Sequence, residues 1–286
     1  MGFEPTVGFP TLDFESSALN RTQPPFQSLD IVNLISGCAI FGPAVCLQRQ
    51  RGTRAFNGAM DVTLTDGGIE TRIIYEFKRP IGDIEAHQLL ADEAGRDILQ
   101  RIYQSYAEVA VRYGLPIQLG MPTSRASRGW TKDVGSVNAA AVELLRAVRQ
   151  QFADAQIILA GVIGPASDGY ATDEALSADA ASVYHRDQAD VLAGLDVDLL
   201  YAPTFPAFSE LSGVARAMAE TGRPYALAPM LHPNGTMLDG TTLADAIARI
   251  DAEISPPPRH YMLGCLYPTH AQTALQALRA CPVRSR

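Results

Sequence analysis

The sequence predicts an α/β fold made of repeated strand–helix units. From residue 60 to residue 286, short apolar runs alternate with longer amphipathic segments, and no hairpin signal separates them. No Gly-x-Gly-x-x-Gly motif follows any of the apolar runs, which argues against a dinucleotide-binding sheet. Strand followed by helix, repeated six times, therefore favours a parallel sheet that curls into a (β/α) barrel of the TIM type.

Each predicted strand is a run of four or five mostly apolar residues, which is typical of a strand buried in a parallel sheet. In chain order the runs are VTLT (62–65), IQLG (117–120), IILAG (157–161), LLYA (199–202), YALAP (225–229) and YMLGC (261–265). Between them, apolar residues such as Val142, Leu145 and Val148 recur at intervals of three, which predicts helices. The predicted helices are 139–152, 177–195, 209–221, 242–254 and 269–280.

The number of units is smaller than a closed barrel needs. Eight units take about 250 residues, and the sequence shows six before Arg286. A six-stranded barrel leaves unpaired edges on its first and last strands. We therefore expect either a truncated C-terminus or a partner that completes the sheet, such as a second copy in a homo-oligomer. The predicted domain is a partial barrel over residues 60–286.

Residues 1–59 are predicted to form a poorly structured N-terminal extension. Pro, Ser, Thr and Asn recur there at irregular spacing, with neither the strand period nor the helix period. One way to encode residues 2–5 is the reverse complement of a transfer-RNA T arm, in which case Met60, directly before the first strand, is the natural start. An ordinary extension is the alternative, and the DNA upstream of the Met60 codon distinguishes the two.

Composition and charge narrow the class of ligand. Hydrophobic residues make up 47% and charged residues 19% of the chain, as in folded globular proteins. The net charge is −8 and no basic run is interleaved with aromatic residues, so nucleic acid is not expected as a partner. No apolar stretch reaches the ~18 residues of a membrane span. Four cysteines without a Cys-x-x-Cys pair favour a cytoplasmic location, and a small molecule is the expected partner.

In barrel enzymes the active site is built from loops at the carboxyl ends of the strands. Several short motifs stand at or beside those positions. In chain order they are Asp66-Gly67-Gly68, Pro122-Thr123 with Arg125-Ala126, Gly164-Pro165, Tyr184-His185, Leu238-Asp239-Gly240 and Gly264-Cys265. This ordered set resembles the homocysteine S-methyltransferase family over residues 65–280. The order of the motifs, rather than any single one, carries the resemblance.

The resemblance implies a barrel that binds homocysteine as a zinc-held thiolate and takes a methyl group from a sulfonium, a betaine-type amine or a methylfolate. Zinc would keep the thiol ionised at neutral pH, where a free thiol is mostly protonated. By the same resemblance, Asp66, Gly67 and Thr123 bind substrate and Cys265 ligates zinc. The structural alternatives are a small buried cysteine for Cys265 and an Asp-Gly turn for Asp66.

Two features depart from the family pattern. Pro203 occupies the place of a glutamate that receives the amino group of homocysteine in many members, which leaves the thiol acceptor open. The family's other zinc ligands, a cysteine pair near strand eight, lie beyond the six units, whereas a zinc site needs at least three protein ligands. Cys281 and His232 are weaker candidates. We therefore expect the chain itself to transfer little or no methyl group to homocysteine; the alternative function is a non-catalytic barrel that retains at most a binding pocket.

Other side chains are expected to serve the scaffold. We expect His185 to form a hydrogen bond within the scaffold rather than to act in acid–base chemistry. Trp130 and Tyr170 are either an aromatic wall for a methylated cation or ordinary packing residues. The acidic segment 83–97 is expected to be a solvated helix face.

Overall fold

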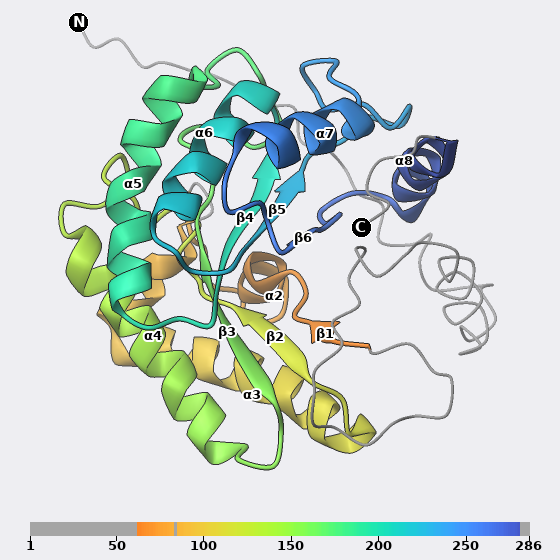
Figure 1. Ribbon diagram of the computed structural model, residues 1–286. Helices are drawn as coiled ribbons and strands as arrows, with labels where there is room; N and C mark the ends of the chain where they lie inside the picture. Colours follow the sequence, from red (N-terminus) through yellow and green to blue (C-terminus); the bar gives the residue numbers. More distant parts are fainter. Residues whose placement is uncertain (1–61, 83–84, 281–286) are drawn as a thin grey trace, which may run out of the picture. The chain divides into compact units, whose positions relative to one another are not determined.

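Six parallel strands form the sheet at the centre of the fold (Figure 1). The structure, a computed structural model, describes residues 62–82 and 85–280, which belong to one unit of the chain, Phe41–Arg286. The predicted extension 1–59, the alternative start at Met60 and Cys281 lie outside the described residues. The strands are β1 Leu64–Thr65, β2 Ile117–Gly120, β3 Ile157–Val162, β4 Leu199–Phe205, β5 Tyr225–Pro229 and β6 His260–Tyr261.

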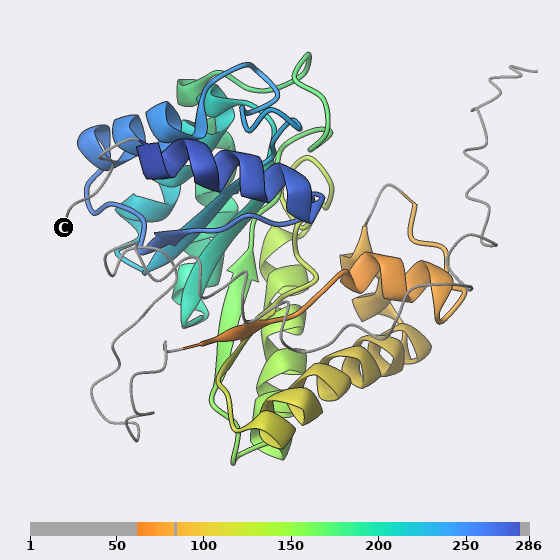
Figure 2. The same cartoon turned by 90° about the vertical axis from the view of Figure 1, so that its right-hand side faces the viewer.

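The strands stand in the order β1-β2-β3-β4-β5-β6, and each pairs in parallel with its neighbour in the sequence. The connecting elements are α2 Ile69–Tyr75, η1 Ala86–Ala91, α3 Glu93–Tyr113, α4 Val134–Gln151, α5 Ala178–Gly194, α6 Phe208–Glu220, α7 Leu243–Glu253 and α8 Pro268–Ala280. The sheet curls into a half-barrel, with α3 to α7 following one another in an arc around the strands (Figures 1 and 2). This confirms the predicted α/β architecture and the sequential strand order.

Four helices begin at a side chain that caps their first turn. In each, a side-chain oxygen accepts a hydrogen bond from the backbone N–H three residues later, which the helix would otherwise leave without a partner. The distances are 2.7 Å for Asp92 and Gly95, 2.9 Å for Asp133 and Ser136, 3.3 Å for Ser177 and Ala180, and 3.1 Å for Thr242 and Asp245. Two predicted helices, 177–195 and 242–254, start at these capping residues.

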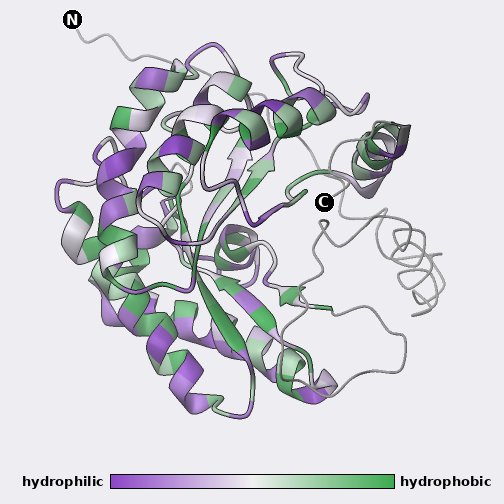
Figure 3. Ribbon diagram, viewed as in Figure 1, coloured by the Kyte–Doolittle hydropathy of each residue, from purple (hydrophilic) through white to green (hydrophobic). Residues whose placement is uncertain are grey.

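The hydropathy of the elements follows their position in the fold. Strands β2 and β5 are buried along their whole length, which is why they are continuous apolar runs rather than alternating ones. Figure 3 shows hydrophobic strands and helices that carry hydrophobic and hydrophilic residues on different faces. Where α5 meets α6, a Cβ on Gly213 would lie 2.4 Å from the Ala178 carbonyl oxygen, so only glycine fits. None of the helices within the described residues is long and apolar enough to cross a membrane.

Two expectations about local structure differ from the fold. Strand β6 ends at Tyr261, so Cys265 lies in a bend after the strand and not at its end. The expectation of a solvated helix face is wrong for the middle of segment 83–97, because η1 turns four side chains into the interior against α3 and α4. These buried residues are Ala86, His87, Leu89 and Leu90.

Candidate functional site

Asp66 anchors the candidate site at the carboxyl ends of the first two strands. It directly follows β1, and its Oδ2 accepts a hydrogen bond of 2.7 Å from the N–H of Gly120, the last residue of β2. The side chain therefore joins two strands, which a simple Asp-Gly turn would not require. The next residue, Gly67, is exposed and lies close to α3, where a Cβ would meet the Tyr106 hydroxyl at 2.9 Å. The absence of a side chain at Gly67 keeps this approach open.

The Asp66 carboxyl is energetically costly to ionise. Burial raises its pKa to about 7, and repulsion from Glu70 adds to this rise, while the hydrogen bond from Gly120 lowers the pKa. Burial also raises the pKa of Glu70, the second residue of α2. No Lys, Arg or His of residues 62–82 and 85–280 forms an ion pair with either carboxylate. The described part of the site thus holds two carboxyl groups without a protein cation.

A thiol and two tyrosines complete this cluster. Cys265 is exposed, with φ 56° in the left-handed region, and its thiol lies near enough to the Tyr170 hydroxyl for the two groups to affect each other's pKa. Partial burial of the sulfur and repulsion from Glu70 raise the pKa of the Cys265 thiol, whereas the Tyr170 contact lowers it. Burial, and then the charges of Cys265 and Asp66, raise the pKa of Tyr201. Because these groups shift one another's pKa, we treat Asp66, Glu70, Tyr170, Tyr201 and Cys265 as one candidate site, which we call the Asp66 cluster.

The sequence indicated Asp66 and Cys265 but neither Glu70 nor Tyr201. Glu70 lies on the first turn of α2, close behind Asp66 in the sequence, and its place at the start of the helix that follows the motif is the one signal that could have suggested a second carboxylate. Tyr201 sits within the predicted fourth strand, and its position in the site depends on the curl of the sheet. Pro203, two residues later, lies where the register between β4 and β5 shifts.

Thr123 lies at the end of β2 but apart from the open part of the site. It is fully buried, and its hydroxyl donates a hydrogen bond of 2.7 Å to the Val162 carbonyl oxygen of β3. Its own carbonyl oxygen accepts a hydrogen bond of 2.7 Å from the Gln188 side chain. The hydroxyl therefore ties two strands together, and a contact of Thr123 with substrate stays a prediction.

The loop between β3 and α5, residues 163–177, carries Tyr170 and is held by the preceding loop. The Trp130 indole N–H donates a hydrogen bond of 3.2 Å to the Ala166 carbonyl oxygen. The Arg125 guanidinium lies over the Trp130 ring, 4.2 Å from its centroid, and donates to the carbonyl oxygens of Pro165 and Ser167. Trp130 and Arg125 thus contribute to the scaffold of the site.

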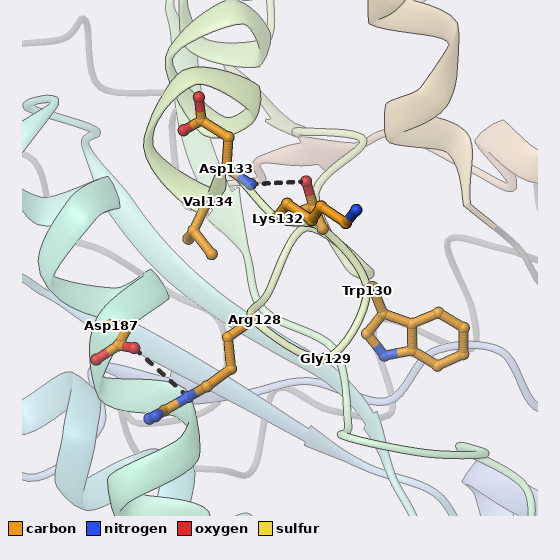
Figure 4. A pocket seen from close by; sticks show the side chains of 8 residues that line it. Arg128, Gly129, Trp130, Lys132, Asp133, Val134 and Asp187 are labelled. Atoms are coloured by element: carbon orange, nitrogen blue, oxygen red, sulfur yellow. Dashed lines mark hydrogen bonds and ion pairs between the residues drawn. The ribbon is translucent and has the colours of Figure 1, made fainter.

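An open cavity of about 690 Å³ lies beside the start of α4 (Figure 4). It is lined by Arg128, Gly129, Trp130, Thr131, Lys132, Asp133, Val134 and Asp187, none of which belongs to the Asp66 cluster. Arg128 and Asp187 form an ion pair of 3.4 Å across it, as Figure 4 shows. Because two of its charged groups are paired with each other, this cavity offers less unbalanced charge than the Asp66 cluster.

The described residues do not by themselves fit a zinc ion. Within residues 62–82 and 85–280, no group of three or more His, Cys, Asp or Glu side chains comes together as a metal site. Cys265 is one potential ligand, whereas His232 is exposed on the loop after β5 and His260 belongs to β6. A zinc site needs at least three protein ligands.

Comparison with known proteins places this curled sheet and its strand-end site in a barrel methyltransferase family. The family model described as homocysteine S-methyltransferase matches residues 63–285. The chain therefore belongs to the homocysteine S-methyltransferase family, as the ordered motifs predicted.

Individual relatives agree with this assignment. The chain is 25% identical over 247 residues to the homocysteine S-methyltransferase of Escherichia coli strain K12, in an alignment that covers 80% of this chain and 77% of the relative. The metallated form of the homocysteine methyltransferase MmuM from Escherichia coli superposes with a TM-score of 0.66 at 20% identity, over 77% of this chain and 80% of that one. Its apo form gives a TM-score of 0.59 at 22% identity, over 79% and 81%. These structures support the fold.

Proposed function

We propose that this protein transfers a methyl group to the sulfur of an amino-acid thiol of the homocysteine kind, at the carboxyl ends of its strands. Two findings support this: the family match over residues 63–285, and the Asp66 cluster, whose two carboxyl groups have no ion-pair partner among the described residues and lie near a cysteine. The cluster carries the proposal, because an anionic site of this kind is complementary to a substrate that brings a positive charge.

The carboxyl groups of Asp66 and Glu70 are proposed to receive the ammonium group of the acceptor. A bound cation would remove the repulsion between them and favour the ionised form of Asp66, whose pKa of about 7 leaves it partly protonated at neutral pH. Glu70 comes from α2, whereas the family glutamate would come from the position of Pro203. The second carboxylate of the site is thus provided by another element. Gly67 would leave room for the acceptor, and Thr123 would hold the ends of β2 and β3.

The chemical step is a displacement at the methyl carbon. The acceptor thiol releases its proton to solvent, and the sulfur forms a bond to the methyl carbon. The bond from that carbon to the donor's sulfur or nitrogen breaks, and its electron pair stays on the donor, which leaves as a thioether or an amine. Zinc is the cofactor that the family suggests, and Cys265 is the position we propose for a ligand. Because the described residues do not complete a zinc site, we assign them only binding and orientation of the acceptor.

The setting of the reaction follows from the same proposal. Methylation of homocysteine would yield methionine, so the protein would serve methionine biosynthesis, and the cysteine pattern favours the cytoplasm. Strands β1 and β6 pair on one side only among the described residues, which favours a homo-oligomer that covers their free edges.

Binding and turnover of homocysteine by the full chain test the proposal. Calorimetry should show binding that Glu70→Gln weakens about tenfold, as expected for loss of one charge-assisted contact. Glu108→Gln, at an exposed glutamate of α3, is the matched control and should bind like the wild type. The affinity for 4-mercaptobutanoate, a thiol that lacks the ammonium group, should be the same in Glu70→Gln and the wild type.

Methionine formation, measured by mass spectrometry with S-methylmethionine, S-adenosylmethionine or betaine as donor, tests the catalytic part. The low rate expected from the sequence stays a prediction that the same assay measures. Binding without any methionine formation would favour the non-catalytic alternative. If the wild type neither binds homocysteine nor forms methionine, the proposed function is refuted.

A further inference from the structure

A buried acid–histidine pair joins helices α5 and α6. His185 of α5 and Glu210 of α6 are fully buried, and the His185 Nε2 lies 3.1 Å from the Glu210 Oε1. The carboxylate also accepts backbone hydrogen bonds from the N–H groups of Ala166, at 2.7 Å, and Leu176, at 3.3 Å. The expectation that His185 forms a hydrogen bond within the scaffold is thus confirmed.

The proton on the pair can be assigned from its contacts. The Nδ1 of His185 has no hydrogen-bond partner among the described residues, whereas its Nε2 faces a carboxylate oxygen. The Nε2–H is therefore the donor, and Glu210 is an acceptor for three N–H groups. The His185 ring is fixed by edge contacts with Tyr184 and Phe205, at centroid distances of 5.0 and 5.5 Å. A buried carboxylate is costly unless it is satisfied in this way.

The two backbone donors belong to opposite ends of the loop 163–177. Ala166 stands near its beginning and Leu176 near its end, and the Ser209 hydroxyl donates a further hydrogen bond of 2.9 Å to the Leu176 carbonyl oxygen. Glu210 therefore connects the two ends of the loop through hydrogen bonds, and it does so from α6, most of whose residues are buried. The close packing of α5 on α6 also depends on Gly213, which has no contact with the loop 163–177 among its nearest atoms.

The tip of the same loop carries Tyr170, whose hydroxyl lies near enough to Cys265 to lower the pKa of its thiol. The tip packs tightly against β4, since a Cβ on Gly169 would lie 2.8 Å from the Thr204 carbonyl oxygen. A rigid loop held at both ends and at the tip has few alternative positions. Fixing the base of the loop therefore fixes where Tyr170 stands relative to Cys265.

We propose that Glu210, oriented by His185, is a positioning residue that holds the loop 163–177 so that Tyr170 stays near Cys265 and borders the acceptor site. Its effect on the acceptor rests on the proposed function. Glu210 touches neither the Asp66 cluster nor the open face of the site by any contact that the structure records, and it acts through Tyr170.

Trp130 provides a spectroscopic reporter for this loop. It is the only tryptophan of the chain, and its indole N–H contacts the loop at the Ala166 carbonyl oxygen. In Glu210→Gln, one acceptor oxygen is replaced by an N–H₂ group, so one of the three donors loses its partner. We expect the fluorescence of Trp130 to shift to longer wavelength and the loop amides to exchange with deuterium about tenfold faster than in the wild type. Glu174→Gln, an exposed glutamate of the same loop, is the control and should change neither signal.

The third measurement is the dissociation constant of homocysteine. Glu210→Gln should raise it about three- to tenfold, and the increase should be smaller in a Tyr170→Phe background, because the two residues act in series. If Glu210→Gln does not fold, residue-resolved exchange on the wild type decides: the amides of Ala166 and Leu176 should be protected relative to that of Glu174.

Four results would overturn the proposal. In Glu210→Gln, these are an unchanged Trp130 fluorescence and loop exchange, an exchange that is faster over the whole sheet alike, and a faster loop exchange with an unchanged dissociation constant of homocysteine. In the wild type, the fourth is a lack of exchange protection at the amides of Ala166 and Leu176. If the wild type does not bind homocysteine, the proposed function fails, and the fluorescence and exchange measurements alone decide whether Glu210 holds the loop.

Discussion

Replacing Asp66 by asparagine is expected to stabilise the fold at pH 8 and to leave its stability nearly unchanged at pH 4. The pKa of the Asp66 carboxyl is raised from 3.8 to about 7 in the folded protein, mainly by burial. Between these two values the native state keeps a proton that the unfolded chain has released. The free energy of unfolding of the wild type therefore falls as pH rises from 4 to 7. Asparagine carries no charge, and its Oδ1 can still accept the Gly120 N–H.

The size of the effect follows from the pKa. A rise of about three units corresponds to about 4 kcal/mol at 1.36 kcal/mol per unit, which is an upper limit. Asp66 is only partly buried, so solvent screens part of this cost and about 2 kcal/mol of stabilisation at pH 8 is the expected value. This gain should come with weaker homocysteine binding, because the cost of ionising Asp66 is the feature that suits it to a cation.

Urea unfolding at pH 4, 6 and 8 measures this difference. Asp154→Asn, at an exposed aspartate after α4, serves as the matched control and should change stability little at any pH. A stability difference between Asp66→Asn and the wild type that is the same at pH 4 and pH 8 would refute the reasoning. A destabilised variant at pH 8 would do the same, since it would mean that the ionised carboxylate supports the fold.

Three further substitutions test the site and its scaffold. Tyr170→Phe should raise the pKa of the Cys265 thiol by removing the hydroxyl that lowers it, as measured by the pH dependence of Cys265 alkylation in mass spectrometry. Burial lowers the pKa of His260 to about 4, so between pH 6.5 and pH 4 the unfolded chain takes up a proton that the folded protein does not, and the wild type loses stability. His260→Gln should reduce this loss by up to about 3 kcal/mol, as measured by urea unfolding. Gly213→Ala should destabilise the fold by about 1–3 kcal/mol, since a Cβ would lie 2.4 Å from the backbone of α5, whereas Gly194→Ala, with no atom within 4 Å, should not.

Each of these has an outcome that contradicts it. An unchanged alkylation profile in Tyr170→Phe would show that the hydroxyl does not stabilise the thiolate. Equal acid sensitivity of His260→Gln and the wild type would show that this histidine is ionised in the native state. A Gly213→Ala variant as stable as Gly194→Ala would show that α5 and α6 can separate at no cost.

The sequence predicted the fold well where the signal is local. Strands β2, β3 and β5 are continuous apolar runs because both faces of a parallel sheet are covered, and the runs at 117–120 and 225–229 match the observed strands residue for residue. Capping side chains at Ser177 and Thr242 marked the starts of two helices. The short edge strands β1 and β6 were predicted too long, because each pairs with its neighbour at only two positions.

The candidate site was predicted in part. Asp66 and Cys265 could be found because each stands in a motif at or shortly after the end of a strand, and the family assignment that those motifs suggested is confirmed. Glu70 and Tyr201 could not be found in this way, because neither belongs to a motif and both enter the site from elements distant from Cys265 in the sequence. Thr123 stands in a motif, yet its buried hydroxyl serves the backbone of β3.

Composition, periodicity and motif order by themselves determined the α/β class, the sequential parallel sheet and the family of this protein. These properties depend on interactions between residues close in sequence, or on patterns repeated along it. Only the tertiary structure decided that two carboxyl groups lack a cation among the described residues and that Tyr170 lies near Cys265. It also showed that Glu210 holds both ends of one loop. Such contacts join residues tens to hundreds of positions apart, and their strength depends on burial, which the folded chain creates and the sequence does not display.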